Sequence, residues 1–228
     1  MKNAIKMMGL VALGSVIFAS SCKKDDDPSD EKTMYIILPG ADAQTEAQTA
    51  LIEMDNGDTI YFNGASFSFN NTLSLEGKDR IVIMGNGRLQ TDLNFAGQTA
   101  GAEGLKITNA DDFTIMNLTI TDAKGDAIKV RESDGVVFRS MGAVWSGTPK
   151  SGNGAYGLYP VLCQNVLIDS CYVFGAIDAG IYVGQTTNAV VRNSTAEGNV
   201  AGIEIENTIN ADVYDNHSFD NTGGVLVF

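Results

Sequence analysis

The chain has 228 residues, of which 44% are hydrophobic, and it contains 25 glycines and only 4 prolines. This length is sufficient for a single domain with a substantial buried core. The formal net charge of -13 argues against binding to nucleic acid and against adhesion to anionic lipid, because both need a basic surface.

The first 21 residues have the pattern of an export signal. Lys2 and Lys6 precede an apolar stretch, residues 7–21, which ends in small residues and is too short for a transmembrane helix. Cys22 follows, and the sequence around it resembles the lipobox of bacterial lipoproteins. The resemblance implies that residues 1–21 are removed and that Cys22 is lipidated, anchoring the protein in the bacterial outer membrane on its periplasmic or cell-surface face. The alternative is an ordinary signal peptide with an incidental cysteine.

Residues 22–33 are expected to form a charged tether. The run KKDDDPSDEK (23–32) contains a proline and no apolar residue, so it has nothing to bury in a core. A lysine followed by acidic residues directly after the lipobox cysteine also resembles the export signal of surface lipoproteins in one Gram-negative phylum. We therefore expect an exported domain that begins at residue 34.

The rest of the sequence, residues 34–228, repeats with a period of 22–23 residues. Equivalent segments are separated by steps of 22, 32, 23, 30, 23 and 22 residues, so two turns are longer than the others. These segments begin at Thr59, Ile81, Phe113, Val136, Val166, Ala189 and Ala211. Short segments of alternating polarity recur in every turn, whereas a helical repeat would need about ten periodic residues per element.

This repeat predicts an all-β parallel β-helix of about seven coils. One turn is too small to enclose a core, but turns stacked about 4.8 Å apart bury a shared one. Two columns of apolar side chains are expected to face inward. They are Ile83, Ile115, Phe138, Ile168, Val191 and Val213, and Leu105, Ile128, Leu158, Ile181, Ile203 and Val225.

Polar corners separate the predicted strands. Asn165, Asn188 and Asn210 share one corner position, where stacked amides can bond their neighbours at about 1 kcal/mol per satisfied hydrogen bond. Cys171 falls in an inward column with Leu118 and Met141. Two cysteines are not a disulfide framework, so Cys163 and Cys171 are expected to be free thiols.

The N-terminal end of the repeat has its own pattern. Residues 44–69 begin with a short amphipathic helix and continue through Gly57-Asp58-Thr59-Ile60 into a strand. This resembles the start of proteins of the pectate-lyase-like superfamily. The resemblance implies a single-stranded, right-handed solenoid whose open end is covered by a capping helix. At the other end the sequence stops within a predicted strand, so we expect the domain to be truncated there.

Residues 153–228 carry a closer resemblance, to bacterial lipoproteins known as parallel β-helix repeat-containing proteins. It extends over residues 34–228. It is specific for fold but says little about activity, because that family has no established reaction. Members are often encoded beside a second exported, cytochrome-like protein. The resemblance therefore also implies a structural or scaffolding module that serves such a partner.

Two insertions interrupt the period, within residues 85–104 and 144–157, and both are expected at the same corner of the coil. Loops on a rigid solenoid often carry function, and neutral variation of loop length is the alternative. The strand beside this corner presents an outward column of polar and aromatic residues. Its members are Lys106, Lys129, Tyr159, Tyr182 and Glu204.

This mixture of rings, carboxylates and cations predicts a carbohydrate-binding face. Rings stack on the apolar faces of sugars, carboxylates accept from hydroxyls, and cations can pair with the carboxylate of an acidic polysaccharide. The predicted ligand-binding residues are Trp145, Tyr156, Tyr159, Tyr182, Arg131 and Glu204, with Trp145 on an exposed loop. The alternative is an ordinary outward face with Lys129 and Glu204 as cross-strand charges.

An enzyme acting on uronate polysaccharides is a second predicted function. A lyase or C5-epimerase needs a base near C5 and a cation at the carboxylate, which Lys129, Asp126 and Asp178 can supply. No metal site or cofactor is predicted, with calcium as the one candidate ion for such an enzyme. The paired aspartates of polygalacturonases, the Asp-His element of pectate lyases and the Asp-Pro-His-Asp element of alginate epimerases are missing from the sequence.

Overall fold

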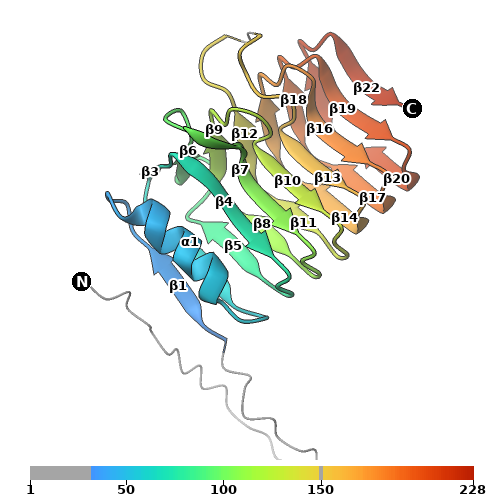
Figure 1. The fold of residues 1–228 in the computed structure, drawn as a ribbon. Helices are drawn as coiled ribbons and strands as arrows, with labels where there is room; N and C mark the ends of the chain where they lie inside the picture. The colour runs from blue at the N-terminus through green and yellow to red at the C-terminus, as the bar shows by residue number, and fades with distance from the viewer. Residues whose placement is uncertain (1–31, 149–150) are drawn as a thin grey trace, which may run out of the picture.

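The computed structural model describes residues 32–148 and 151–228, which form a parallel β-solenoid (Figure 1). The strands belong to three parallel sheets, here named A, B and C, and each coil passes through them in that order. The predicted all-β solenoid with a short N-terminal helix is confirmed. The predicted signal peptide, Cys22 and the tether up to residue 31 lie outside the described residues and stay predictions.

Every strand pairs with the equivalent strand of the next coil. Sheet A contains β1 (Met34–Ile37), β2 (Thr59–Phe62), β5 (Val82–Gly85), β8 (Thr114–Met116), β11 (Val137–Arg139), β14 (Gln164–Asp169), β17 (Thr187–Arg192) and β20 (Ile209–Tyr214). Sheet B contains β3 (Ser66–Ser68), β6 (Asp92–Asn94), β9 (Thr119–Thr121), β12 (Gly142–Val144), β15 (Tyr172–Phe174), β18 (Thr195–Glu197) and β21 (His217–Phe219). Sheet C contains β4 (Asn71–Glu76), β7 (Ala100–Thr108), β10 (Ile128–Arg131), β13 (Leu158–Val161), β16 (Ala179–Gly184), β19 (Ala201–Glu206) and β22 (Gly223–Val227).

The solenoid has about eight turns rather than seven. The additional strand is β1, which precedes the helix and pairs with β2, so that sheet A has eight strands. The predicted alignment of Thr59 with Ile81 is also wrong by one residue, because Thr59 pairs with Val82. Strand β1 precedes the helix in the sequence. The helix separates it from the repeated segments, so the repeat pattern does not reveal it.

The predicted inward columns are confirmed by the strand register. Ile83 pairs with Ile115, and Leu105 pairs with Ile128, and both columns continue through the later coils. Most of these side chains are fully buried, whereas Val213 is partly buried and Val225 is 49% exposed in the last described coil. Alternation along each strand therefore builds one continuous apolar core.

Helix α1 (Ala43–Glu53) covers the end of the core near the N-terminus (Figure 1). It buries small and aliphatic side chains, Ala43, Ala47, Ala50 and Leu51. Two glutamines on the helix bond the backbone of β4. Gln44 accepts from the Asn71 N–H and donates to the Asn71 carbonyl, both at 3.2 Å, while Gln48 donates to the Ser74 carbonyl at 3.0 Å and accepts from its N–H at 2.9 Å. The predicted capping helix is confirmed.

The predicted asparagine column is a hydrogen-bonded ladder. The Asn210 amide donates to Asn188 at 3.2 Å, and the Asn188 amide donates to Asn165 at 3.0 Å. Asn165 in turn donates to the Asp134 carboxylate at 2.6 Å. All three asparagines have φ between 50° and 60°, a conformation that asparagine adopts more readily than most residues. The corner therefore needs asparagine for its backbone as well as for its side-chain bonds.

The prediction that the two insertions share one corner is only partly right, because residues 95–99, between β6 and β7, lie at the corner of residues 144–157 but the rest of the first insertion does not. Residues 144–157 do lie at the corner between β12 and β13. The first insertion is divided between two corners. Part of it lies between β5, which ends at Gly85, and β6, which begins at Asp92, a connection that is only two residues long between β8 and β9. This part, residues 86–91, projects over sheet B instead of sheet C.

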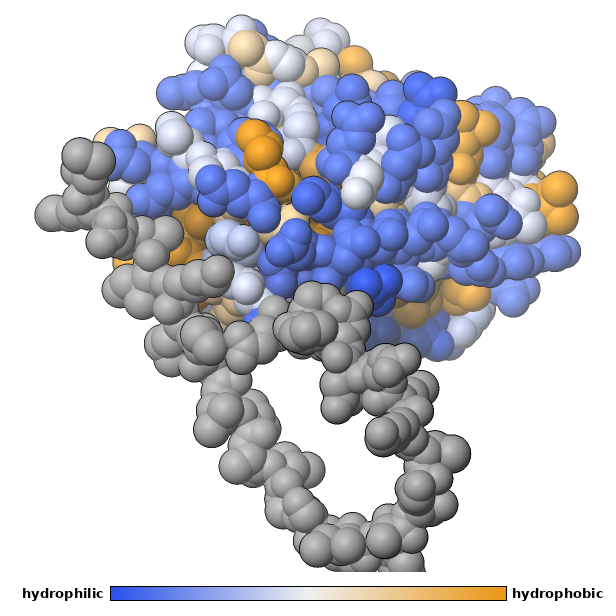
Figure 2. All heavy atoms as spheres, turned by 60° about the horizontal axis from the view of Figure 1, so that its bottom comes forward, coloured by the Kyte–Doolittle hydropathy of each residue, from blue (hydrophilic) through white to orange (hydrophobic). Residues whose placement is uncertain are grey.

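The surface in Figure 2 is mostly hydrophilic, with hydrophobic side chains at separate positions. Leu38 and Ile52 are among the large hydrophobic residues that are more than half exposed. Single exposed hydrophobic side chains of this kind are normal on protein surfaces. Within residues 32–148 and 151–228, no helix is long and apolar enough to cross a bilayer.

Candidate functional site

Three tyrosines form a compact cluster on the outward face of sheet C. Tyr159 lies on β13, Tyr182 lies on the adjacent β16, and Tyr156 comes from the inserted loop directly before β13. The ring centroid of Tyr156 is 4.6 Å from that of Tyr159 and 4.8 Å from that of Tyr182, and the centroids of Tyr159 and Tyr182 are 4.9 Å apart. Tyr182 is buried, whereas the other two rings are partly exposed. The structure thus brings together all three predicted tyrosines.

Carboxylates surround this tyrosine cluster. The hydroxyl of Tyr182 donates to Glu206. Burial is the main cause that raises the pKa of Tyr182, and the Glu206 carboxylate raises it further. Burial and the carboxylate of Asp178 raise the pKa of Tyr156 in the same way. Glu204 lies beside Tyr182 in the strand register, and its pKa is raised by burial and by the charges of Asp178 and Glu206. The side of the cluster toward β19 is therefore acidic.

The two cations on β10, the strand beside Tyr159, already have partners. The Lys129 Nζ lies 4.6 Å from the centroid of the Tyr159 ring and 3.9 Å from the Asp126 carboxylate. The Arg131 guanidinium pairs with Glu132 at 2.9 Å. Burial raises the pKa of Asp126 to about 6, and the charge of Lys129 opposes this shift. Asp126 is thus a carboxyl group that titrates near neutral pH, next to an ammonium group.

Trp145 is not exposed, and its predicted role in ligand binding is not compatible with its position. Its side chain is 3% exposed, and its indole N–H donates to the Ala123 carbonyl at 2.7 Å. Trp145 continues the alternation of β12, in which Ala143 faces inward and Val144 outward, so it turns into the core. The loop folds back over the indole. Gly154 in this loop lies so close to the ring that a Cβ added there would be 2.6 Å from an indole carbon. In the sequence, the alternation of residues 142–145 is the pattern that indicates a buried Trp145.

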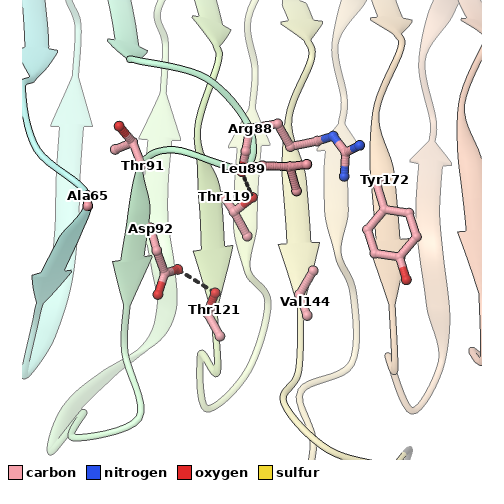
Figure 3. A pocket seen from close by; sticks show the side chains of 9 residues that line it. All are labelled: Ala65, Arg88, Leu89, Thr91, Asp92, Thr119, Thr121, Val144 and Tyr172. Carbon is pink, nitrogen blue, oxygen red and sulfur yellow. Dashed lines mark hydrogen bonds between the residues drawn. The ribbon is translucent and has the colours of Figure 1, made fainter.

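Sequence reasoning missed a second group of polar side chains, which lies on sheet B (Figure 3). They line a groove of about 260 Å³ between residues 86–91 and the outward face of the sheet. Arg88, Asp92 and Tyr172 are its principal polar side chains. The sequence does not point to them, because the insertion that carries Arg88 is predicted at a different corner.

The described residues contain no group of three or more histidine, cysteine, aspartate or glutamate side chains placed to hold a metal ion. Cys163 and Cys171 are both buried, free thiols. Burial raises the pKa of each, so neither is an activated nucleophile. The chemistry of the site therefore lies in its tyrosines, carboxyl groups and Lys129.

Comparisons with known proteins agree with this architecture. A family model described as "Right handed beta helix region" matches residues 103–228, which is more than half of the chain. The chain therefore belongs to the right handed beta helix family. A search of curated proteins finds no match to this sequence.

Solved structures show the same fold at low identity. Pectate lyase Pel9A is 13% identical with a TM-score of 0.54, and the alignment covers 85% of this chain and 67% of that one. A pectin methylesterase mutant in complex with a hexasaccharide is 14% identical with a TM-score of 0.51, covering 81% and 67%. ORF18 of Geobacillus virus E2 is 9% identical with a TM-score of 0.52, covering 82% and 52%.

Proposed function

We propose that this chain binds carbohydrate on the outward face of sheet C. The observation that carries the proposal is the tyrosine cluster, Tyr156, Tyr159 and Tyr182, with carboxylates along its edge. Aromatic rings held by their neighbours can stack on the apolar face of a sugar at little cost in conformational entropy. The pectin methylesterase of the same fold, solved with a hexasaccharide, supports a saccharide ligand.

The charges of the cluster favour an uncharged saccharide at this face. Lys129 is paired with Asp126, and Arg131 is paired with Glu132. A ligand carboxylate would have to displace these protein carboxylates to reach the cations. Glu204 and Glu206 would repel a second negative charge, whereas their oxygens can accept from sugar hydroxyls. We therefore narrow the ligand from an acidic polysaccharide to a neutral one.

Replacing Tyr159 with alanine is expected to weaken binding of a neutral oligosaccharide about tenfold, because one stacking surface is lost. A glycan array of neutral oligosaccharides identifies the ligand, and calorimetry with the whole chain measures its affinity. Tyr214→Ala is a matched control, because Tyr214 is an exposed tyrosine on sheet A. Unchanged affinity in Tyr159→Ala, or an equal loss in Tyr214→Ala, would contradict the proposal.

Asp126 supports a second candidate function, a uronate lyase or C5-epimerase. A carboxyl group with a pKa of about 6 can exchange a proton near neutral pH, and the Lys129 ammonium lies 3.9 Å from it. A lyase would release an unsaturated uronate that absorbs in the ultraviolet. We expect that absorbance to disappear in Lys129→Ala, and its absence with the unmodified chain would exclude the lyase.

A further inference from the structure

Strand β1 and helix α1 lie side by side at the N-terminal end of the solenoid (Figure 1), and a groove of about 370 Å³ runs between them. One wall of the groove is formed by residues 33–37, which include all of β1. The other wall is a single stripe along the helix. Its members are Thr45, Glu46, Thr49, Ala50 and Glu53.

The two walls of the groove have the same length. Residues 33–37 span about 13 Å, because each residue of a strand adds about 3.3 Å. From Thr45 to Glu53 the helix rises about 12 Å, at about 1.5 Å per residue. The groove therefore follows β1 from end to end, and an extended segment of about five residues fits along it.

The backbone of β1 pairs along only one of its two edges. On the side of β2, the Ile37 carbonyl accepts from the Asn63 N–H at 2.9 Å. Backbone groups alternate in direction along a strand, so the N–H and carbonyl groups of Met34 and Ile36 point away from β2. The described part of the chain places no strand beyond β1 in sheet A and supplies no hydrogen bond to these groups. Such an edge can pair with another extended segment.

The strand wall of the groove is apolar. Met34 is 40% exposed, and the side chains of Tyr35 and Ile36 are partly exposed beside it. An added strand would therefore bury apolar side chains against β1 while its backbone pairs with the open edge. Apolar residues at alternate positions of the added strand would share the face that meets this wall.

The helix wall of the groove is acidic. Glu46 and Glu53 are both exposed, and in the ranges that the structure describes neither has a cationic side chain within 4.0 Å. Negative charge also reaches the strand wall. Burial raises the pKa of Tyr35, and the charges of Asp58, Asp55 and Glu53 raise it further. The groove is thus complementary to a ligand that carries positive charge.

We propose that this groove binds an extended segment of a partner protein in which apolar residues alternate with lysine or arginine. The segment adds to β1 as a further strand of sheet A, and its cations pair with Glu46 and Glu53. A second copy of this chain is a poorer occupant, because pairing β1 with its own copy brings two acidic helix walls together. Residues 23–32 lack the apolar side chains that the strand wall requires. The proposal is independent of sugar binding, because the groove shares no residue with the tyrosine cluster.

Fluorescence anisotropy with two short labelled peptides tests the charge complementarity. One peptide alternates lysine with valine, and the other alternates glutamate with valine. The whole chain should bind the lysine peptide about tenfold more tightly than the glutamate peptide. A double variant, Glu46→Gln with Glu53→Gln, should remove most of this preference. Asp212→Asn is the matched control, because Asp212 is exposed on β20 at the opposite end of sheet A, and it should leave both affinities unchanged.

Proline at Ile36 tests the strand pairing. Ile36→Pro removes an N–H that points away from β2, so the ladder between β1 and β2 stays intact, and proline is tolerated on edge strands. Binding of the lysine peptide should weaken about tenfold, whereas Ile36→Val keeps the N–H and should bind like the unmodified chain. Circular dichroism verifies that each variant is folded. Tyr159→Ala should leave peptide binding unchanged, which separates this groove from the site on sheet C.

Sedimentation velocity identifies the competing occupant of the groove. The unmodified chain without peptide should sediment as a monomer. A dimer that Ile36→Pro dissociates would show that a second copy fills the groove and would overturn the proposal. Equal affinity for the two peptides, or full affinity for the lysine peptide in folded Ile36→Pro, would overturn it as well.

Discussion

Replacing Trp145 with alanine is expected to lower the free energy of unfolding by about 3–5 kcal/mol. The side chain is 3% exposed within the core, so truncation leaves a large cavity between β12 and the loop that folds over it. The change also leaves the Ala123 carbonyl without its indole donor, which adds about 1 kcal/mol. Urea denaturation followed by circular dichroism measures the loss.

Trp145→Phe separates the two contributions. Phenylalanine retains most of the ring volume but cannot donate to Ala123, so a loss of about 1–2 kcal/mol is expected. Tyr214→Ala, at an exposed aromatic position, should cost less than about 0.5 kcal/mol. If Trp145→Ala abolished sugar binding while leaving stability unchanged, the ring would be a surface ligand, and its buried position would be incorrect.

Replacing Asp126 with asparagine is expected to make the stability of the protein less dependent on pH. Burial raises the pKa of Asp126 from 3.8 to about 6, so the folded state binds this proton more tightly than the unfolded state. The stabilisation that this proton provides is fully present below about pH 4 and is lost as the pH rises through 6. Asparagine stays neutral at every pH. Between pH 4 and pH 8, the free energy of unfolding of the variant should therefore rise by about 3 kcal/mol at most relative to that of the unmodified chain.

Denaturation curves at pH 4, 5, 6, 7 and 8 test this difference. Lys129→Met tests the direction of the pKa shift, because the Lys129 charge lowers the pKa of Asp126. Without that charge the transition should move to higher pH. The side chain of Asp126 is only 15% exposed, so screening by salt should change the result little. Parallel stability profiles for Asp126→Asn and the unmodified chain would show that burial does not perturb this group.

Much of the fold follows from a period of two along each strand and 22–23 along the chain. These periods place Ile115 and Ile128 inward, Tyr159 and Tyr182 outward, and Asn188 at a corner, as the structure confirms. Stacked coils repeat the same physical demand, so equivalent positions carry equivalent residues. The face of tyrosines and charges on sheet C is predictable for this reason.

The parts that sequence reasoning missed lie where the period is interrupted. Trp145 adjoins an insertion and is therefore predicted in the loop, although the alternation of β12 continues through it. Arg88 lies in an insertion that is divided between two corners. The repeat spacing gives only the number of extra residues and does not indicate how they are divided. Its contact with Tyr172 joins residues three coils apart along sheet B, and only the stacking geometry reveals it.

The glutamines of α1 have a consequence for self-association. The outer edge of β4 is where a strand of another molecule would add by backbone pairing. The side-chain amides of Gln44 and Gln48 occupy peptide groups at two points along that edge, as a paired strand would. A strand of a second molecule cannot pair there without displacing the helix. At this edge the protein carries its own barrier against end-to-end polymerisation into fibres.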